Sequence, residues 1–393
     1  MLREDHAGLN VAYFAFDQFM PSNHAGFVHT YSIVKAIKNI GNYVEIYGIP
    51  NGEDLFNIFR WRGRCDRIPL NYVRFTVSFK LKYKLLYPLN IISYYKTLES
   101  LNKQNPDIIH ERFHVPNPYS IKICEALKIP KVLEVNSLYV EEGIYKGNKR
   151  TIALKQRKWH FDQCKAIITQ TETLKEIIET LTDKPVFVVS NGVDTEIFNP
   201  DAPYYGLRDK LNLKNEHIVT FVGSFRKWHG VDQILEMARK LRTCNIKFLL
   251  IGSGELFEDI KNNKEGNMIL VGAKKHAEIP QYLALSDILI APFDERYFEG
   301  SNFWWNPVKL FEYMASGKPV ISYNYNEVRN IVRDGGLLAE IGDLDDLIEK
   351  LEYLIENESL RKRLGDNGRK IAQKEYTWTK KAEETAKVYE WVI

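Results

Sequence analysis

The chain has 393 residues, of which 45% are hydrophobic and 27% are charged, and its formal net charge at pH 7 is +3. This length predicts two domains, and this balance of residues is ordinary for a soluble globular protein. A net charge this small excludes the strong basic excess that marks nucleic-acid-binding proteins.

The cysteines and apolar runs indicate a cytoplasmic protein. The cysteines form no CxxC pair or Cys/His cluster, which predicts unpaired thiols and no metal at any of the four, Cys65, Cys124, Cys164 and Cys244. The polar N-terminus does not resemble a signal peptide. No run of about 18 apolar residues is present, as a membrane-spanning helix would need.

Short apolar runs alternate with helical segments along the whole chain. In the first half a helix is expected at 28–39 and strands at 11–16, 43–47, 106–110, 129–135, 166–169 and 186–189. In the second half a helix is expected at 231–241 and strands at 218–223, 247–251, 268–271, 288–291 and 319–322. Strands that alternate with helices predict parallel βαβ units.

The pattern restarts near residues 191–194, and the polar stretch 199–205 reads as a linker. The C-terminal segment, after Trp378, is amphipathic and is expected to return to the first domain. The predicted fold is therefore α/β, with two Rossmann-like parallel-sheet domains facing a central cleft. The first comprises residues 1–198 with 378–393, and the second 199–377. Ligands of such sheets bind at the carboxyl ends of the strands.

The stretch from Asn306 to Ile321 predicts an anion site. Asn306 is a good N-cap and the following proline suits the first helical position, so a helix begins abruptly there. Its free N–H groups and partial positive charge favour a phosphate, and Lys309 adds a full charge. Glu312 on the same helix can accept hydrogen bonds from ribose hydroxyls. The alternative is a common helix start whose charged side chains face water.

Two loops that follow strands in the second domain are further candidates. The loop from Gly223 to Gly230 offers up to three phosphate donors, Arg226, Lys227 and His229, although it could be a solvated basic loop. Gly252 and Gly254 follow the next strand and let the backbone approach a ligand closely. The alternative for these two glycines is a plain tight turn.

In the first domain, polar residues follow the ends of the predicted strands. His24 and Gly26 lie in the loop after the first strand. The others follow or end later strands and could supply a general base for an acceptor hydroxyl, or be surface groups: His110, Glu134, Asn136, Glu141 and Glu142.

Two charged segments have simpler readings. Asp343-Leu-Asp345-Asp346 resembles a metal-binding DxD sequence, but it is interpreted as the acidic start of a helix over 345–355. The stretch Phe79–Tyr87 alternates lysines with aromatic and aliphatic residues. Such stretches can lie on anionic lipid, which would place the protein at the inner face of the cell membrane, or they can be solvated.

Together these segments resemble glycosyltransferase family 4, whose members have the two-domain GT-B fold. The most specific motifs are 191–200, 223–232, 251–254, 286–292 and 306–320. The resemblance implies transfer of a sugar from a nucleotide donor with retention of anomeric configuration. It places the donor on the second domain and the acceptor on the first, and it implies no metal or other cofactor.

The resemblance also assigns roles to individual residues. Glu312 resembles the second glutamate of the E-x7-E element, which holds the donor ribose. Val308 and Lys309 match the helix start that meets the diphosphate, and Gly26 matches the glycine loop near it. The expected donor-binding set is Gly26, Ser224, His229, Gly252, Gly254, Asn306, Val308, Lys309 and Glu312.

This chain departs from the family pattern at three places. Trp304 stands where the first glutamate of E-x7-E is expected. Ser224 and His229 stand where the phosphate-binding Arg and Lys would fall, so Arg226 and Lys227 are interpreted as their substitutes. Asn136 stands where a histidine is usual.

The expected activity is retaining transfer of a hexosyl group from a UDP- or GDP-hexose to a glycan or lipid-linked acceptor. The expected catalytic residues are Arg226, Lys227, Asn136 and His24, with His110, Glu134 and Glu141 on the acceptor side. Three alternatives remain open. They are an NDP-sugar epimerase, a sugar phosphorylase of the same fold, and a nucleotide-sugar-binding protein without activity.

Overall fold

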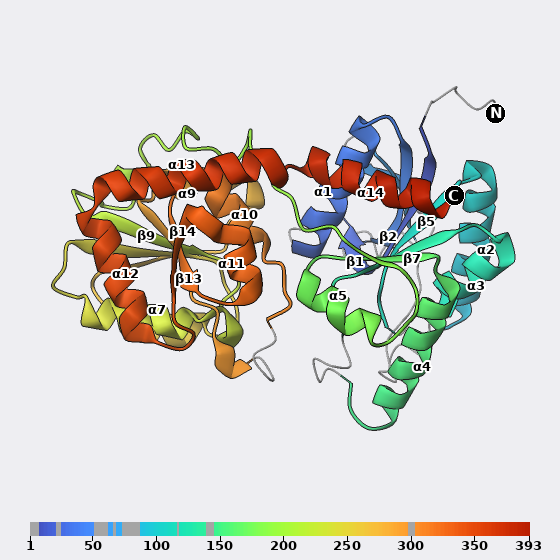
Figure 1. Cartoon of the computed structure of the whole chain (residues 1–393), viewed down its shortest axis with the longest axis horizontal. Coiled ribbons are helices and arrows are strands. Elements are labelled where there is room, and N and C mark those ends of the chain that lie inside the picture. Colours follow the sequence, from blue (N-terminus) through green and yellow to red (C-terminus); the bar gives the residue numbers. More distant parts are fainter. Residues whose placement is uncertain are drawn as a thin grey trace. The chain divides into compact units, whose positions relative to one another are not determined.

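The computed structural model describes residues 8–20, 25–50, 62–65, 68–72, 87–115, 118–138, 145–297 and 303–393. The chain forms two compact units (Figure 1). The N-terminal unit comprises residues 1–190 with 378–393, and the C-terminal unit comprises 191–377. The boundary lies before the expected position at residue 198. The backbone N–H and the side-chain amide of Asn191 both donate hydrogen bonds to Asn306. These bonds fix residue 191 to the C-terminal unit.

The N-terminal unit contains one mostly parallel sheet with the strand order β3-β4-β2-β1-β5-β6-β7-β8. The strands are β1 (Asn10–Met20), β2 (Tyr43–Pro50), β3 (Arg62–Cys65), β4 (Ile68–Tyr72), β5 (Ile108–Arg112), β6 (Lys131–Val135), β7 (Ala166–Thr169) and β8 (Val186–Val188). Only the edge pair β3–β4 is antiparallel among these strands. The direction of strand addition reverses between β1 and β5, and such a switch point is where ligands of open sheets bind.

Both faces of this sheet are buried. Residues that alternate along β1 contribute to different apolar clusters: Val11, Tyr13 and Ala15 to one, and Ala12, Phe14 and Phe16 to the other. The first cluster includes residues of α1 (Ala25–Asn39) and of the C-terminal helix α14 (Trp378–Val392), which pack against each other. The second includes residues of α2 (Tyr87–Gln104) and α3 (Pro118–Leu127). Further helices are α4 (Asn148–Gln163) and α5 (Glu172–Glu179).

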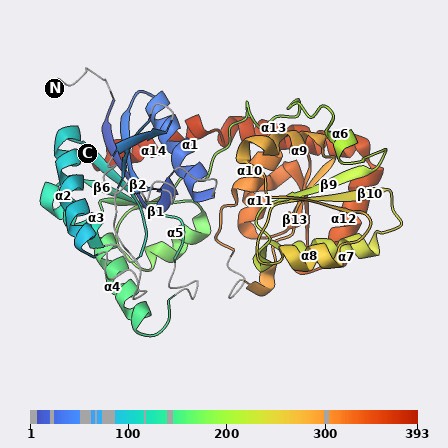
Figure 2. The ribbon, with the colours of Figure 1, turned by 180° about the vertical axis from the view of Figure 1, so that it is seen from behind.

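The C-terminal unit has a parallel sheet with the Rossmann order β11-β10-β9-β12-β13-β14. Its strands are β9 (His217–Val222), β10 (Ile246–Ile251), β11 (Met268–Gly272), β12 (Ile288–Ala291), β13 (Val320–Tyr323) and β14 (Gly336–Ala339). The helices are α6 (Leu207–Lys210), α7 (Val231–Lys240), α8 (Phe257–Asn263), α9 (Ile279–Leu285), α10 (Val308–Ala315), α11 (Asn326–Val332), α12 (Leu344–Glu356) and α13 (Glu358–Glu375). Figure 2 shows α7 and α8 on one side of this sheet and α9, α10 and α13 on the other. The switch point lies between β9 and β12.

The two sheets confirm the predicted α/β class. Two local expectations have clear outcomes. Asp343 caps α12 by accepting a hydrogen bond from the backbone N–H of Asp346, so the acidic segment is a helix start. The stretch 199–205 is not a free linker, because Ala202 is buried and the preceding Phe198 belongs to the core of the C-terminal unit.

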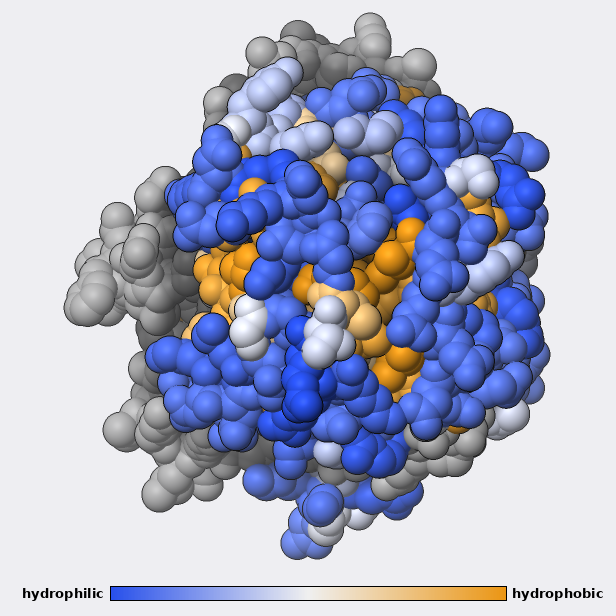
Figure 3. Space-filling model, turned by 90° about the vertical axis from the view of Figure 1, so that its left-hand side faces the viewer, coloured by the Kyte–Doolittle hydropathy of each residue, from blue (hydrophilic) through white to orange (hydrophobic). Residues whose placement is uncertain are grey.

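None of the helices in the described ranges has both the length and the apolar character needed to cross a bilayer. Polar and charged residues cover most of the face of the C-terminal unit in Figure 3, and apolar atoms reach the surface in patches between them. Exposed apolar residues on this scale are normal for globular proteins.

Candidate functional site

The candidate site of the C-terminal unit lies at its switch point. Strand β9 ends at Val222, and Gly223 follows it with a φ of +155°. A Cβ atom built at Gly223 would lie 2.5 Å from Nζ of Lys309, the second residue of α10. The carboxyl end of β9 and the beginning of α10 are therefore in direct contact, and a side chain at position 223 would displace the tip of the lysine.

Lys309 carries an ammonium group with no hydrogen-bond partner among the described residues. Its stem is partly exposed, but Nζ is buried. Nζ lies 4.2 Å from the ring centroid of Phe221 and 5.6 Å from that of Phe293, so aromatic faces supply the attraction. Burial lowers the pKa of Lys309 to about 7, although Glu312 opposes that shift. A buried cation without an ionic partner is costly, which favours binding of an anion beside it.

The start of α10 differs in detail from the prediction. Pro307, not Asn306, occupies the N-cap, and no side chain caps the helix. Oδ1 of Asn306 instead accepts a hydrogen bond from the backbone N–H of Asn191 at 2.7 Å. The Asn306 side chain is therefore used to hold the first residue of the C-terminal unit. The predicted N-cap was therefore wrong. The N–H groups of Val308 and Lys309 lie in the first turn, where a helix offers them no acceptor. These groups and the ammonium group together suit a phosphate.

Glu312 lies one turn after Lys309 and binds His276, a residue that belongs to none of the sequence motifs. His276 places Nε2 at 2.6 Å from Oε1 of Glu312. Burial of the imidazole opposes protonation, but the hydrogen bond and the charge of Glu312 raise the pKa of His276 overall. No local signal in the sequence marks His276, because it comes from the short 3-10 helix His276–Glu278 after β11.

The basic loop after β9 divides into exposed and buried parts. Arg226 and Lys227 are exposed, so they can reach a ligand in solution. His229 is buried, and its Nδ1 lies 2.5 Å from the carbonyl oxygen of Ser224, which requires Nδ1 to be protonated as a donor. Burial, with Lys309 and Arg226 nearby, lowers the pKa of His229 to about 2. His229 is therefore neutral and does not supply the charge expected of it.

The glycines after β9 and β10 bring two loops together. A Cβ at Gly252 would lie 1.8 Å from the carbonyl oxygen of Gly223, and one at Gly254 would lie 2.7 Å from the backbone nitrogen of Phe225. The loops also share hydrogen bonds, for example from the Phe225 N–H to the carbonyl of Ser253 at 2.9 Å. Contact between backbones thus accounts for Gly252 and Gly254 without a ligand.

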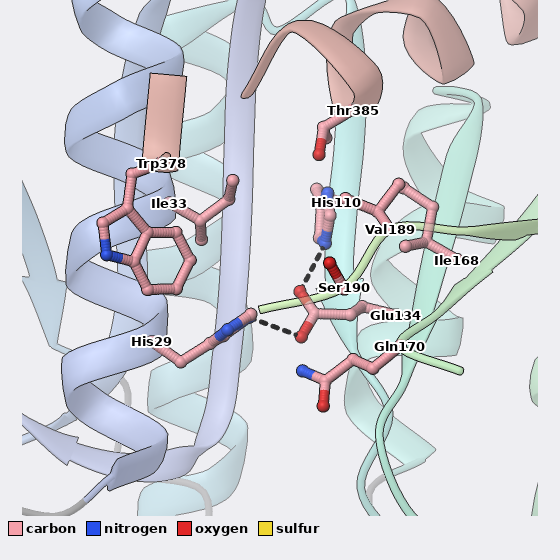
Figure 4. A pocket seen from close by; sticks show the side chains of 10 residues that line it. All are labelled: His29, Ile33, His110, Glu134, Ile168, Gln170, Val189, Ser190, Trp378 and Thr385. Carbon is pink, nitrogen blue, oxygen red and sulfur yellow. Dashed lines mark hydrogen bonds and ion pairs between the residues drawn. The ribbon is translucent and has the colours of Figure 1, made fainter. Parts of the chain in front are cut away.

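In the N-terminal unit, the polar centre is the buried carboxylate of Glu134 at the end of β6. Two histidines approach its two oxygens (Figure 4): His29 Nε2 lies 2.9 Å from Oε1, and His110 Nε2 lies 2.9 Å from Oε2. Three more groups donate to the same carboxylate, namely the Tyr13 hydroxyl, the Arg112 guanidinium and the Asn136 amide. We call these six residues the Glu134 cluster.

The Glu134 cluster is saturated rather than poised for proton transfer. Burial raises the pKa of Glu134, but His29, Arg112 and the hydrogen bonds outweigh it and hold the pKa well below the ordinary value. A carboxylate offers about four lone pairs, so the four hydrogen bonds from Tyr13, His110, Arg112 and Asn136, with His29 close by, leave little capacity for another. Glu134 is thus poorly suited to be the general base, since an effective base has a pKa near the working pH.

The C-terminal helix contributes to the same cluster. Tyr389 of α14 places its hydroxyl 2.7 Å from Nδ1 of His110, whose other nitrogen faces Glu134. Trp378 and Thr385, also from this helix, line the small cavity beside Glu134 (Figure 4). The sequence predicted that the C-terminal segment is a helix, but not that it reaches His110.

The structure says less about the remaining residues that the sequence predicted for the site. Gly26 lies in the first turn of α1. His24, Glu141 and Glu142 lie outside the described residues, as does most of the basic stretch Phe79–Tyr87. Trp304, in the place of the expected glutamate, is buried. In the described ranges, no group of three or more His, Cys, Asp or Glu side chains is arranged to hold a metal ion.

Two family models match the chain. Residues 27–197 match the model described as Glycosyltransferase Family 4, and residues 207–371 match that of the Glycosyl transferases group 1. An uncharacterized glycosyltransferase of Methanocaldococcus jannaschii is 28% identical over 312 residues, which is 76% of this chain and 80% of that protein. The UDP-Gal:alpha-D-GlcNAc-diphosphoundecaprenol alpha-1,3-galactosyltransferase of Escherichia coli is 26% identical over 69% of this chain and 71% of its own length.

Solved structures resemble the whole chain. Sucrose-phosphate synthase of Thermosynechococcus elongatus superimposes with a TM-score of 0.74, at 17% identity, over 97% of this chain and 98% of its own. Anabaena HepE, in complex with UDP and glucose, gives a TM-score of 0.74 at 16% identity, over 98% and 100% of the two chains. Because the sequence identities are this low, the structural similarity establishes the fold alone.

Proposed function

The chain belongs to the group 1 glycosyltransferases of family 4 and has their GT-B fold, and from this premise we propose that it is a retaining hexosyltransferase. It takes a hexosyl group from a UDP- or GDP-hexose and delivers it to a hydroxyl group of a glycan or lipid-linked acceptor. The nucleotide-sugar donor is supported by relatives and structural neighbours. The E. coli relative is named for a UDP-galactose donor, and HepE was solved with UDP and glucose.

The observation that carries the proposal is the environment of Lys309. Its ammonium group is buried over Phe221 without a hydrogen-bond partner among the described residues, at the start of a helix that offers its own first N–H groups no acceptor. A sugar diphosphate bears the negative charge that this arrangement lacks. Charge also grows on the diphosphate as the glycosyl bond breaks, so the same groups would stabilise the transition state.

The proposed reaction needs no carboxylate pair. The bond between the anomeric carbon and the diphosphate oxygen breaks, and the electron pair leaves with the diphosphate. The acceptor oxygen forms its bond to the same face of that carbon, and its proton passes to the leaving phosphate. Glu134 already accepts four hydrogen bonds and has His29 beside it. This is consistent with the departing phosphate, rather than a side chain, taking the proton.

Exposed Arg226 and Lys227 would complete the charge around the diphosphate, because guanidinium and ammonium groups both match phosphate oxygens. Asn136 and His24 would act from the N-terminal unit on the transferred sugar. Gly26 would let the backbone approach the donor phosphate. His110 belongs to the Glu134 cluster and would support the acceptor side indirectly.

The acceptor class is proposed from relatives. The E. coli relative is named for a diphosphoundecaprenol-linked acceptor, and a Staphylococcus aureus relative, 26% identical over 49% of this chain, is named for capsular polysaccharide biosynthesis. An acceptor on a lipid carrier would place the enzyme at the inner face of the cell membrane. The basic stretch Phe79–Tyr87 would then make the peripheral contact with anionic lipid.

A donor screen tests the proposal. Purified protein is heated with UDP-, GDP- and ADP-hexoses, and the donor that raises the melting temperature is then incubated with glycan and polyprenyl-diphosphate-linked acceptors. We expect stabilisation by a UDP- or GDP-hexose and a product whose NMR coupling shows the retained configuration. An inverted product, interconversion of the sugar without acceptor, or no stabilisation by any sugar nucleotide would contradict the proposal.

A further inference from the structure

We propose that His276 is a positioning residue that holds the carboxylate of Glu312 in the orientation that binds the donor ribose. This inference rests on the proposed function, because it takes Glu312 as the ribose contact. It concerns a residue that neither the sequence motifs nor the comparisons assign.

The contact between the two side chains is close and well protected. His276 Nε2 lies 2.6 Å from Oε1 of Glu312, whose residue is only 6% exposed. The imidazole side chain is 40% exposed, and its ring also packs against Phe198, with ring centroids 5.3 Å apart. The histidine thus reaches from the surface to a carboxylate that is almost fully buried.

This contact leaves one carboxylate oxygen for a ligand. Nε2 donates to Oε1, whereas no described residue donates a hydrogen bond to Oε2. Glu312 also lies close enough to Lys309 to oppose the lowering of its pKa. The groups proposed for ribose and for diphosphate are therefore neighbours on the same face of α10, where residues three apart lie together.

The imidazole would contribute by fixing the carboxylate in place. Its N–H holds the carboxylate in one rotamer, so that Oε2 does not have to be ordered when the nucleotide binds. The alternative is that the contact between His276 and Glu312 only holds the 3-10 helix after β11 against α10. In that case its loss would change the stability of the protein but not its selectivity between nucleotides.

Selectivity for the ribose hydroxyl separates these two views. The affinities of UDP and 2′-deoxy-UDP are measured by calorimetry for the wild type, His276→Leu and His276→Gln. GDP and 2′-deoxy-GDP are used if the donor screen selects guanine. The control is His217→Leu, which removes another histidine of this unit that lies near a carboxylate, 4.0 Å from Asp287.

We expect the wild type to prefer the ribonucleotide by about tenfold, as a hydrogen bond to a charged group would give. His276→Leu should reduce this preference to less than about threefold, while His276→Gln, which can still donate to Glu312, should restore most of it. His217→Leu should leave the preference unchanged. An unaltered preference in His276→Leu would overturn the inference, whereas failure of the wild type to bind either nucleotide would overturn the proposed function instead.

Discussion

Nζ of Lys309 lies 4.2 Å from the centroid of the Phe221 ring, with no hydrogen-bond partner among the described residues. An ammonium group in this position costs the folded protein stability, since it has lost water and gained only an aromatic face. Such a cost is typical of groups that are retained for binding rather than for folding. The first two predictions follow from this relationship.

Replacement of Lys309 by Met should separate stability from binding. The aliphatic stem and volume are largely kept and the buried charge is removed, so the free energy of unfolding should rise by about 1–3 kcal/mol at pH 7. The stabilisation by UDP- or GDP-hexose should be lost at the same time. Urea unfolding with and without the sugar nucleotide measures both effects.

The matched control for that variant is Lys370→Met, which changes an exposed lysine of α13 in the same unit. It should change neither stability nor binding appreciably. A Lys309→Met protein that binds the donor like the wild type would show that the buried ammonium is not part of the donor site.

The pKa of Lys309 predicts proton uptake on binding. The folded protein lowers it from 10.5 to about 7, so between these values the unfolded chain binds more protons and stability rises with pH. A bound diphosphate restores the charged form. Binding at pH 8 should therefore take up close to one proton, and binding at pH 6 almost none. Calorimetry in two buffers of different ionisation enthalpy measures this uptake, and Lys309→Met should abolish it.

Arg226→Ala with Lys227→Ala should slow transfer without affecting folding. Both side chains are exposed, so the melting temperature should change little. If they stabilise charge on the departing diphosphate, kcat should fall by about a hundredfold or more. Unchanged kcat in a fully folded double variant would remove these two residues from the proposed mechanism.

Glu134→Gln should unfold the N-terminal unit more easily. The amide of glutamine brings its own N–H donors towards a site that four hydrogen-bond donors already occupy, so at least one pair of donors would face each other. We expect a loss of about 3 kcal/mol or more in the free energy of unfolding, as when a buried pair is broken. Glu99→Gln, at an exposed pair of α2 with Lys103, is the comparison and should change stability little. Equal effects of the two substitutions would contradict the role given to the Glu134 cluster.

Gly252→Ala tests the contact between the loops after β9 and β10. The backbone has a φ of +145° there, and the new Cβ would lie 1.8 Å from the carbonyl oxygen of Gly223. The substitution should cost about 3 kcal/mol or more, because both the conformation and the contact are forbidden to alanine. Gly266→Ala is the control, since its Cβ would meet no atom within 4 Å. Tolerance of alanine at position 252 would mean that the loops can move apart.

Much of the fold could be predicted because parallel strands are buried on both faces and form apolar runs. The limits of the strands at Ala166–Thr169 and Ile288–Ala291 are the same in sequence and structure. Strand β4 was missed because Pro69 interrupts a short segment, and β14 because it begins with Gly336 and three of its four residues are only partly buried, whereas β7 and β12 are fully buried apolar runs of the same length.

The candidate site was harder to predict than the fold. The motif at 306–321 identified Lys309 and Glu312, because a helix start and its charges are local features. The partners of site residues are remote in sequence. His276 reaches Glu312 from the 3-10 helix after β11, and Tyr389 reaches His110 of the N-terminal unit across most of the chain. Likewise, the protonation of His229 depends on a carbonyl oxygen whose position only the folded loop defines.

The central claim is that the first turn of α10 and Lys309 hold the donor diphosphate. A crystal structure with the sugar nucleotide selected by the screen tests it most directly. The account predicts a phosphate oxygen within hydrogen-bond distance of Lys309 Nζ and of the N–H groups of Val308 and Lys309. Diphosphate density elsewhere, with Nζ still stacked on Phe221 and bound to nothing, would contradict it.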